Sequence, residues 1–124
     1  MGFDLENTYL ALDGKGGVVP MPVTDDFWMR IDESPAATRS MMAIYPVESD
    51  WPQWEMHPQG EEVLVLLEGH LDMLMDNGTS QYTAEMRAGT TLVVPAGTWH
   101  RALVRAPGKL LGVTYGPGTE HRPA

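Results

Sequence analysis

The chain has 124 residues, a formal charge of −9 and no cysteine. This length supports one domain with a hydrophobic core, and a hydrophobic content of 43% is typical of a folded globular protein. Without cysteine, disulfide scaffolds, thiolate metal sites and cysteine nucleophiles are excluded, so any bound metal must use His, Asp or Glu. The strong negative charge argues against nucleic acid and anionic membrane surfaces as partners.

The first residues, MGFDLENTYL, do not show the basic segment and apolar run of a secretory signal. No stretch approaches the roughly 20 apolar residues that a membrane span requires. We therefore expect a cytoplasmic protein with one domain over residues 1–124. Residues 1–36 are interpreted as an N-terminal extension of loops and strands, and residues 116–124 as a turn-rich tail.

Glycine and proline recur at short intervals along the chain, which leaves no space for long helices. Between them lie short runs rich in Val, Leu, Met, Thr, Trp and Tyr, and evenly spaced runs of this kind indicate a β-sandwich or barrel. We expect strands at residues 38–45, 53–57, 62–67, 70–75, 80–86, 90–94, 99–104 and 109–115. Asn77-Gly78 is predicted to supply both positive-φ residues of a tight hairpin turn.

Four residues have side chains that can bind a metal and spacings that can bring them together: Glu55, His57, Glu62 and His100. Alternate residues of a strand share a face, so Glu55 and His57 project together. A turn over residues 58–60 can return Glu62 beside them, and His100 on a later strand can add a fourth donor in a closed barrel. Such a set suits one divalent Fe, Mn, Ni or Zn ion, and the spacing does not choose among them.

These spacings resemble the two sequence motifs of the cupin family, here over residues 55–69 and 89–104. The first motif has two His separated by one residue, then Glu, six residues and Gly. His57, Glu62 and Gly69 match it, and Glu55 stands in place of the first His. The second motif is matched by the spacing of Gly89, Pro95, Gly97 and His100, while Val104 replaces the family's Asn.

The resemblance is to small single-domain cupins of the RmlC-like superfamily, with a cupin type-2 domain. It implies an all-β fold, an antiparallel jelly-roll β-barrel, with a metal inside the barrel and a cavity open at one end. Glu61 competes with Glu62 as ligand, but only Glu62 leaves six residues before Gly69. Glu55 is either a fourth ligand or a free general base beside the other three ligands.

Strand alternation predicts what surrounds this site. Leu64 and Leu66 should face inward with Glu62, and Ala102 and Val104 with His100, which gives a mostly apolar cavity. Gln53 shares the parity of His57, so it either orients a polar substrate atom or makes an ordinary surface contact. Met56, Met73, Met75 and Trp99 are expected in the core.

Two further histidines are interpreted as lying outside the site. His70 follows Gly69 at a turn and is expected to be structural, and His121 lies in the tail. A tail can fold over a barrel mouth, so a place for His121 at the site remains the alternative. Residues 63–67 are apolar at every position, which predicts cover on both faces of that strand and favours a homodimer.

We therefore expect a metal-binding small cupin that acts as a metal-dependent enzyme on a small, partly apolar organic molecule. Oxygenase, isomerase, lyase and cyclase reactions are all open. Dioxygenase comes first, because two His and one carboxylate resemble the facial ligand set of Fe(II) oxygenases. The alternatives are a non-catalytic small-molecule-binding cupin, for sensing or storage, and an empty barrel with a structural role.

Overall fold

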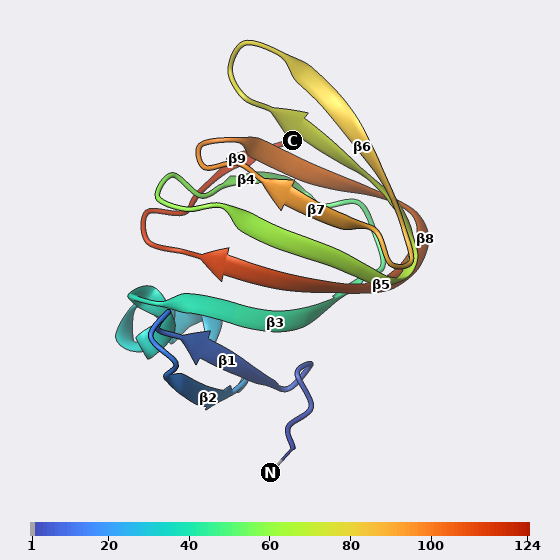
Figure 1. The fold of residues 1–124 in the computed structure, drawn as a ribbon. Coiled ribbons are helices and arrows are strands. Elements are labelled where there is room, and N and C mark those ends of the chain that lie inside the picture. Colours follow the sequence, from blue (N-terminus) through green and yellow to red (C-terminus); the bar gives the residue numbers. More distant parts are fainter. Residues whose placement is uncertain (1) are drawn as a thin grey trace.

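The computed structural model describes residues 2–124 and is built almost entirely of antiparallel strands (Figure 1). The strands are β1 (Thr8–Leu12), β2 (Val18–Pro22), β3 (Ser40–Val47), β4 (Gln53–Met56), β5 (Glu62–Asp76), β6 (Gln81–Arg87), β7 (Thr91–Val94), β8 (Trp99–Tyr115) and β9 (Glu120–Pro123). Two short 3-10 helices, η1 (Trp28–Glu33) and η2 (Pro35–Ala37), connect β2 to β3. The predicted all-β fold is confirmed.

Two long strands, β5 and β8, belong to both layers of the barrel. The first half of β5 pairs with β7 on one side and with the end of β8 on the other. The sheet continues from β8 to β3, and then to β1 and β2. The second half of β5 pairs with β6 and with the start of β8, beside which β4 and β9 lie. Figure 1 shows both strands bending at the same end of the molecule. This arrangement is the jelly roll that the sequence predicts.

Glycine permits the bend in both long strands. The β5–β8 register shifts between Leu66 and Leu71, and Gly69 within this stretch has φ +93°. A Cβ on Gly69 would lie 2.7 Å from the carbonyl oxygen of Ala106, and a Cβ on Gly108 would overlap the backbone of Glu68. Only glycine lets the two backbones approach so closely. The four strands predicted at residues 62–67, 70–75, 99–104 and 109–115 are therefore two continuous bent strands.

The predicted hairpin at Asn77-Gly78 is present between β5 and β6, but its turn is longer than expected. Gly78 has φ +93°, whereas no non-glycine residue among those described has a positive φ. The Asn77 Oδ1 atom instead accepts hydrogen bonds from the backbone N–H groups of Thr79 (3.0 Å) and Ser80 (2.9 Å). The asparagine side chain thus closes the turn, and the predicted two-residue type is wrong.

The predicted tail contains a strand. Residues of β9 pair antiparallel with β4, and the Arg122 guanidinium carbon lies 4.4 Å from the centre of the Trp99 ring and 5.4 Å from that of Trp54. Arg122 Nη2 also lies 3.2 Å from an Asp76 carboxylate oxygen. These cation–π and ionic contacts hold β9 against the outer face of the barrel.

The hydrophobic core has two parts. One fills the barrel and includes Met73 and Met75, as expected, together with Leu66 and Ala102. The other packs η1 and η2 against the β1–β3 part of the sheet. Met56 and Trp99, expected in the core, are only partly buried because they project outward from β4 and β8. Within residues 2–124 no helix is long and apolar enough to cross a membrane.

Candidate metal centre

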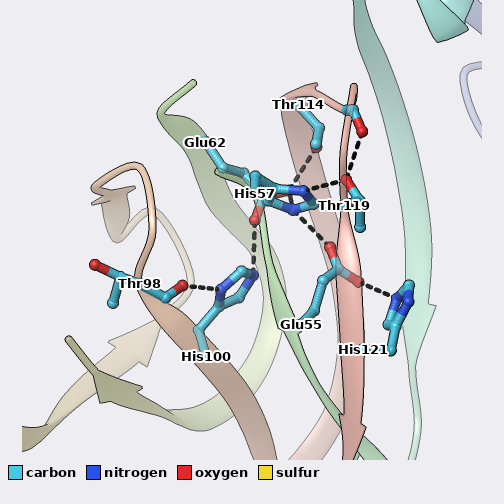
Figure 2. Close-up of polar contacts among 9 residues, drawn as sticks. Glu55, His57, Glu62, Thr98, His100, Thr114, Thr119 and His121 are labelled. Carbon is cyan, nitrogen blue, oxygen red and sulfur yellow. Dashed lines mark hydrogen bonds and ion pairs between the residues drawn. The ribbon is translucent and has the colours of Figure 1, made fainter. Parts of the chain in front are cut away.

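The strand pairing brings the four predicted metal-binding residues together inside the barrel (Figure 2). Glu55 on β4 lies directly opposite His100 on β8, and His57 follows two residues later on the same side. Glu62 is the first residue of β5. One ligand atom from each side chain lies within 4.8 Å of the others. His57, Glu62 and His100 are buried, whereas the Glu55 side chain is 28% exposed.

The donor atoms face one another at ion-pair distances without forming hydrogen bonds among themselves. His57 Nε2 lies 2.7 Å from Glu55 Oε1 and 3.4 Å from Glu62 Oε2, and His100 Nε2 lies 3.0 Å from Glu62 Oε1. His57 Nε2, Glu62 Oε1 and His100 Nε2 are buried and lack a hydrogen-bond partner among the described residues. Unpartnered buried polar atoms are costly. A shared cation would satisfy all of them, so these residues fit a metal ion.

Hydrogen bonds at the opposite ring nitrogens fix which tautomer each neutral imidazole adopts. His100 Nδ1 lies 3.2 Å from the carbonyl oxygen of Thr98, which can only accept, so Nδ1 carries the proton. His57 Nδ1 lies 2.7 Å from Thr119 Oγ1, whose own proton is donated to the Gly116 carbonyl oxygen at 2.7 Å. Both Nε2 lone pairs are then free and point into the cluster, as metal-binding histidines require.

The electrostatics of the cluster also favour a positive charge at its centre. Burial acts to raise the pKa of Glu62, but the close contacts with the His100 and His57 imidazoles outweigh burial and lower the pKa to about 2. Burial acts to lower the pKa of His57, but contacts with Glu55 and Glu62 raise it to about 9. The neighbouring carboxylates thus favour a positive charge at the Nε2 electron pair of His57. A divalent cation competes for the same electron pair.

Burial and contacts distinguish the other residues that the sequence offered for this site, Glu61 and His121. Glu61 is exposed, whereas Glu62 is buried beside the other three potential ligands. His121, interpreted from sequence as lying outside the site, is brought to it by β9: its Nε2 lies 3.3 Å from Glu55 Oε2, and Glu55 is its partner across the β4–β9 ladder. Figure 2 shows Glu55 between His57 and His121. Sequence alone gave no signal for this contact except that a tail can fold over a barrel mouth.

A cavity of about 830 Å³ opens onto Glu55, His57 and Glu62. Leu64 lines it as predicted, whereas Leu66 and Ala102 are fully buried in the core beneath. Val104 is partly buried against the same core. Gln53 is exposed and is not among the lining residues, so a surface role fits better than substrate contact.

His70 forms part of a second group of potential ligands with Asp72 and Glu85. His70 Nε2 lies 3.2 Å from Glu85 Oε2. Asp72 pairs with Arg105, and Glu85 Oε1 lies 3.4 Å from Arg87 Nε. Because arginines already neutralise both carboxylates, these residues form an ion-pair network in which Asp72 is largely buried and Glu85 is exposed, in line with the expected structural role of His70.

Residues 41–115 match the sequence model of the cupin domain, which covers well over half of the chain. The chain therefore belongs to the cupin family and forms a single small cupin domain. Functionally curated protein sequences give no significant match.

Solved structures with a similar fold include several whose descriptions name metals or small molecules. Oxalate decarboxylase from Lactobacillus farciminis, solved as a formate complex, matches with a TM-score of 0.59 and 22% identity over 72% of this chain and 28% of that chain. Hydroquinone 1,2-dioxygenase PnpCD, with Cd²⁺ and 4-hydroxybenzonitrile, matches with a TM-score of 0.53 and 16% identity over 60% of this chain and 56% of that chain. Fe(II)-HppE with the alternative substrate (S)-1-HPP matches with a TM-score of 0.52 and 20% identity over 66% of this chain and 44% of that chain. This chain thus spans only part of each neighbour, and at these identities the similarity shows the fold alone.

Proposed function

We propose that Glu55, His57, Glu62 and His100 hold one divalent transition-metal ion, Fe, Mn, Ni or Zn. The observation that carries the proposal is the set of buried Nε2 and carboxylate atoms that converge without hydrogen bonds while both Nδ1 atoms are engaged. The donor set is borderline to hard, which suits these ions. Glu55 enters as the fourth ligand through Oε1, and its Oε2 is oriented by His121.

We further propose that the protein is a metal-dependent enzyme for a small, partly apolar organic molecule, with dioxygenase as the first reaction class. The chemistry supplied by such an ion is polarisation of a carbonyl or hydroxyl group, or activation of dioxygen. Leu64 and Leu110 line the cavity and exclude water, and Thr98 and Thr119 orient the two imidazoles. The Glu55–His121 pair, at the solvent side, can hold and pass a proton.

The first test is elemental analysis of purified wild-type protein beside His57→Ala and His100→Ala, after reconstitution with each candidate metal. We expect near-stoichiometric metal in the wild type and loss in both variants, because each removes a buried ligand. His70→Ala is the matched control and should retain the metal, since His70 lies in the Glu85 ion-pair network. A wild type that retains no metal would overturn the proposal in favour of an empty barrel.

Glu55→Gln separates the two roles of this residue. The amide keeps the shape of the side chain but is a poor ligand, so we expect weaker metal binding, about tenfold or more. Glu61→Gln, an exposed neighbour, is the control for the same chemical change. Unchanged metal affinity with lost turnover would contradict ligation and assign Glu55 to proton transfer.

Turnover distinguishes an enzyme from a cupin that only binds small molecules. Fe(II)-loaded protein should consume dioxygen in the presence of a small aromatic substrate, and His100→Ala should not. Compounds that bind the loaded wild-type protein and are recovered unchanged, with no oxygen uptake, would favour the binding module used for sensing or storage.

A further inference from the structure

Apart from histidines, every ionisable side chain of charged type that lines the cavity is acidic. Asp32, Glu55 and Glu62 contribute carboxylates, and no lysine or arginine is among the described lining residues. His57 is held between Glu55 and Glu62, and His121 is directed at Glu55, so neither histidine is available to an anionic ligand. A carboxylate or phosphate group entering this cavity would meet no free cationic partner from the protein.

A bound metal ion does not reverse this balance. Glu55 and Glu62 together carry two negative charges, which offset the charge of a divalent ion. The charge that remains in the cavity is then that of Asp32 on η1. Asp32 is exposed, and no hydrogen bond or salt bridge to its side chain occurs in residues 2–124.

Aromatic side chains line the same cavity as Asp32. Trp28 and Asp32, four residues apart, both line the cavity from η1, and the Trp28 ring centre lies 6.2 Å from that of Tyr45 on β3. Trp28 is 53% exposed, so this residue stays accessible to a ligand in the cavity that it lines. Burial, together with the nearby Tyr9, Glu62 and Glu55, raises the pKa of Tyr45, which keeps the phenol neutral. A carboxylate and aromatic rings that line one cavity are a combination that attracts organic cations.

From these observations we propose that the cavity takes a small organic cation, an ammonium group on an apolar or aromatic body. Asp32 pairs with the ammonium group, Trp28 and Tyr45 contact it through their rings, and the apolar body extends toward Leu64 and the metal-binding residues. The identification of this molecule as the enzyme's substrate class rests on the proposed function, whereas the preference for positive charge rests on the cavity alone.

The test compares three probes of similar size by isothermal titration calorimetry on metal-loaded protein: benzyltrimethylammonium, benzyl alcohol and benzoate. The quaternary cation has no atom that can bind a metal, so its affinity reports the Asp32 subsite. We expect it to bind about tenfold more tightly than the alcohol and benzoate to bind weakest. Asp32→Asn should weaken the cation about threefold and leave the alcohol unchanged, and Trp28→Leu should act in the same direction.

Asp25→Asn is the matched control, because it makes the same change in net charge at an exposed residue that does not line the cavity. Equal binding of cation and alcohol, or equal effects of Asp25→Asn and Asp32→Asn, would overturn the inference. Metal content is measured on the same samples. A protein that prefers the cation but holds no metal would refute the metal centre and leave the subsite standing, and the opposite result would refute the subsite alone.

Discussion

At the scale of single residues, the orientation of His57 depends on a hydroxyl group far along the chain. Thr119 Oγ1 accepts the Nδ1 proton of His57 and donates to the Gly116 carbonyl oxygen. Partners that orient a metal-binding histidine typically change metal affinity by about 10- to 100-fold when removed. We therefore expect Thr119→Val to weaken metal binding by about tenfold, measured by competition with a chromophoric chelator.

Two controls separate this effect from a loss of structure. Thr119→Ser keeps the hydroxyl and should retain the wild-type metal affinity. Thr83→Val makes the same change as Thr119→Val at an exposed residue of β6 and should leave the metal affinity unchanged. Affinities of Thr119→Val and Thr83→Val that coincide would show that the hydroxyl does not position the imidazole.

The residues of the candidate metal centre could be predicted from sequence because they follow recognisable local spacings and turns. Glu55, His57 and Glu62 lie within eight residues, from β4 across a turn to the first residue of β5, and His100 follows the recognisable turn Pro95-Ala96-Gly97. Thr119 and His121 could not be assigned in the same way. They lie 62 and 66 residues from their partners, and only the pairing of β9 with β4 brings them close.

At the scale of the elements, the bend of β5 at Gly69 should be intolerant of any side chain. Gly69 and Gly78 have the same φ, +93°, but a Cβ at Gly69 meets backbone oxygens, whereas none of the described atoms lies within 4 Å of a Cβ at Gly78. Gly78→Ala should lower the free energy of unfolding by about 1 kcal/mol, the cost of a positive φ. Gly69→Ala should lower the free energy of unfolding by about 2 kcal/mol more than Gly78→Ala does, because the backbone of β8 must also move.

Chemical denaturation of both variants measures this difference directly. Because the φ values coincide, the difference between the two variants isolates the steric conflict with Ala106 and Pro107. Equal losses of stability in Gly69→Ala and Gly78→Ala would show that the approach of the two strands does not require glycine at the bend.

Most strands could be predicted because alternating or continuous apolar runs mark them. The joining of adjacent runs into β5 and β8 was not predictable, since Gly69 and the Pro107-Gly108 pair look like turns when only local sequence is considered. The strand β9, Glu120–Pro123, has no apolar alternation at all. It is held instead by the β4 ladder and by Arg122 against Trp99 and Trp54, contacts between distant parts of the chain.

At the scale of the whole molecule, one outer face is more apolar than an isolated domain requires. Val93 on β7, Val63 on β5 and Val113 on β8 lie side by side across three strands, and all project away from the core. Val93 is 51% exposed, and Leu67, further along β5, is 38% exposed. This face fits the homodimer predicted from the apolar run at residues 63–67, which stays a prediction.

If a second copy covers this face, the wild type should sediment at twice the chain mass of 13.7 kDa. Val93→Glu should shift it to the single-chain mass, because a charge buried between two apolar surfaces is unfavourable. Tyr82→Glu is the control: Tyr82 is 45% exposed on β6, away from the face, and its change should leave the dimer intact. A wild type at 13.7 kDa over micromolar to millimolar concentrations would refute the dimer. Covering this face would leave the cavity accessible, because the cavity lies on the opposite side of β5, where Glu62 and Leu64 project inward.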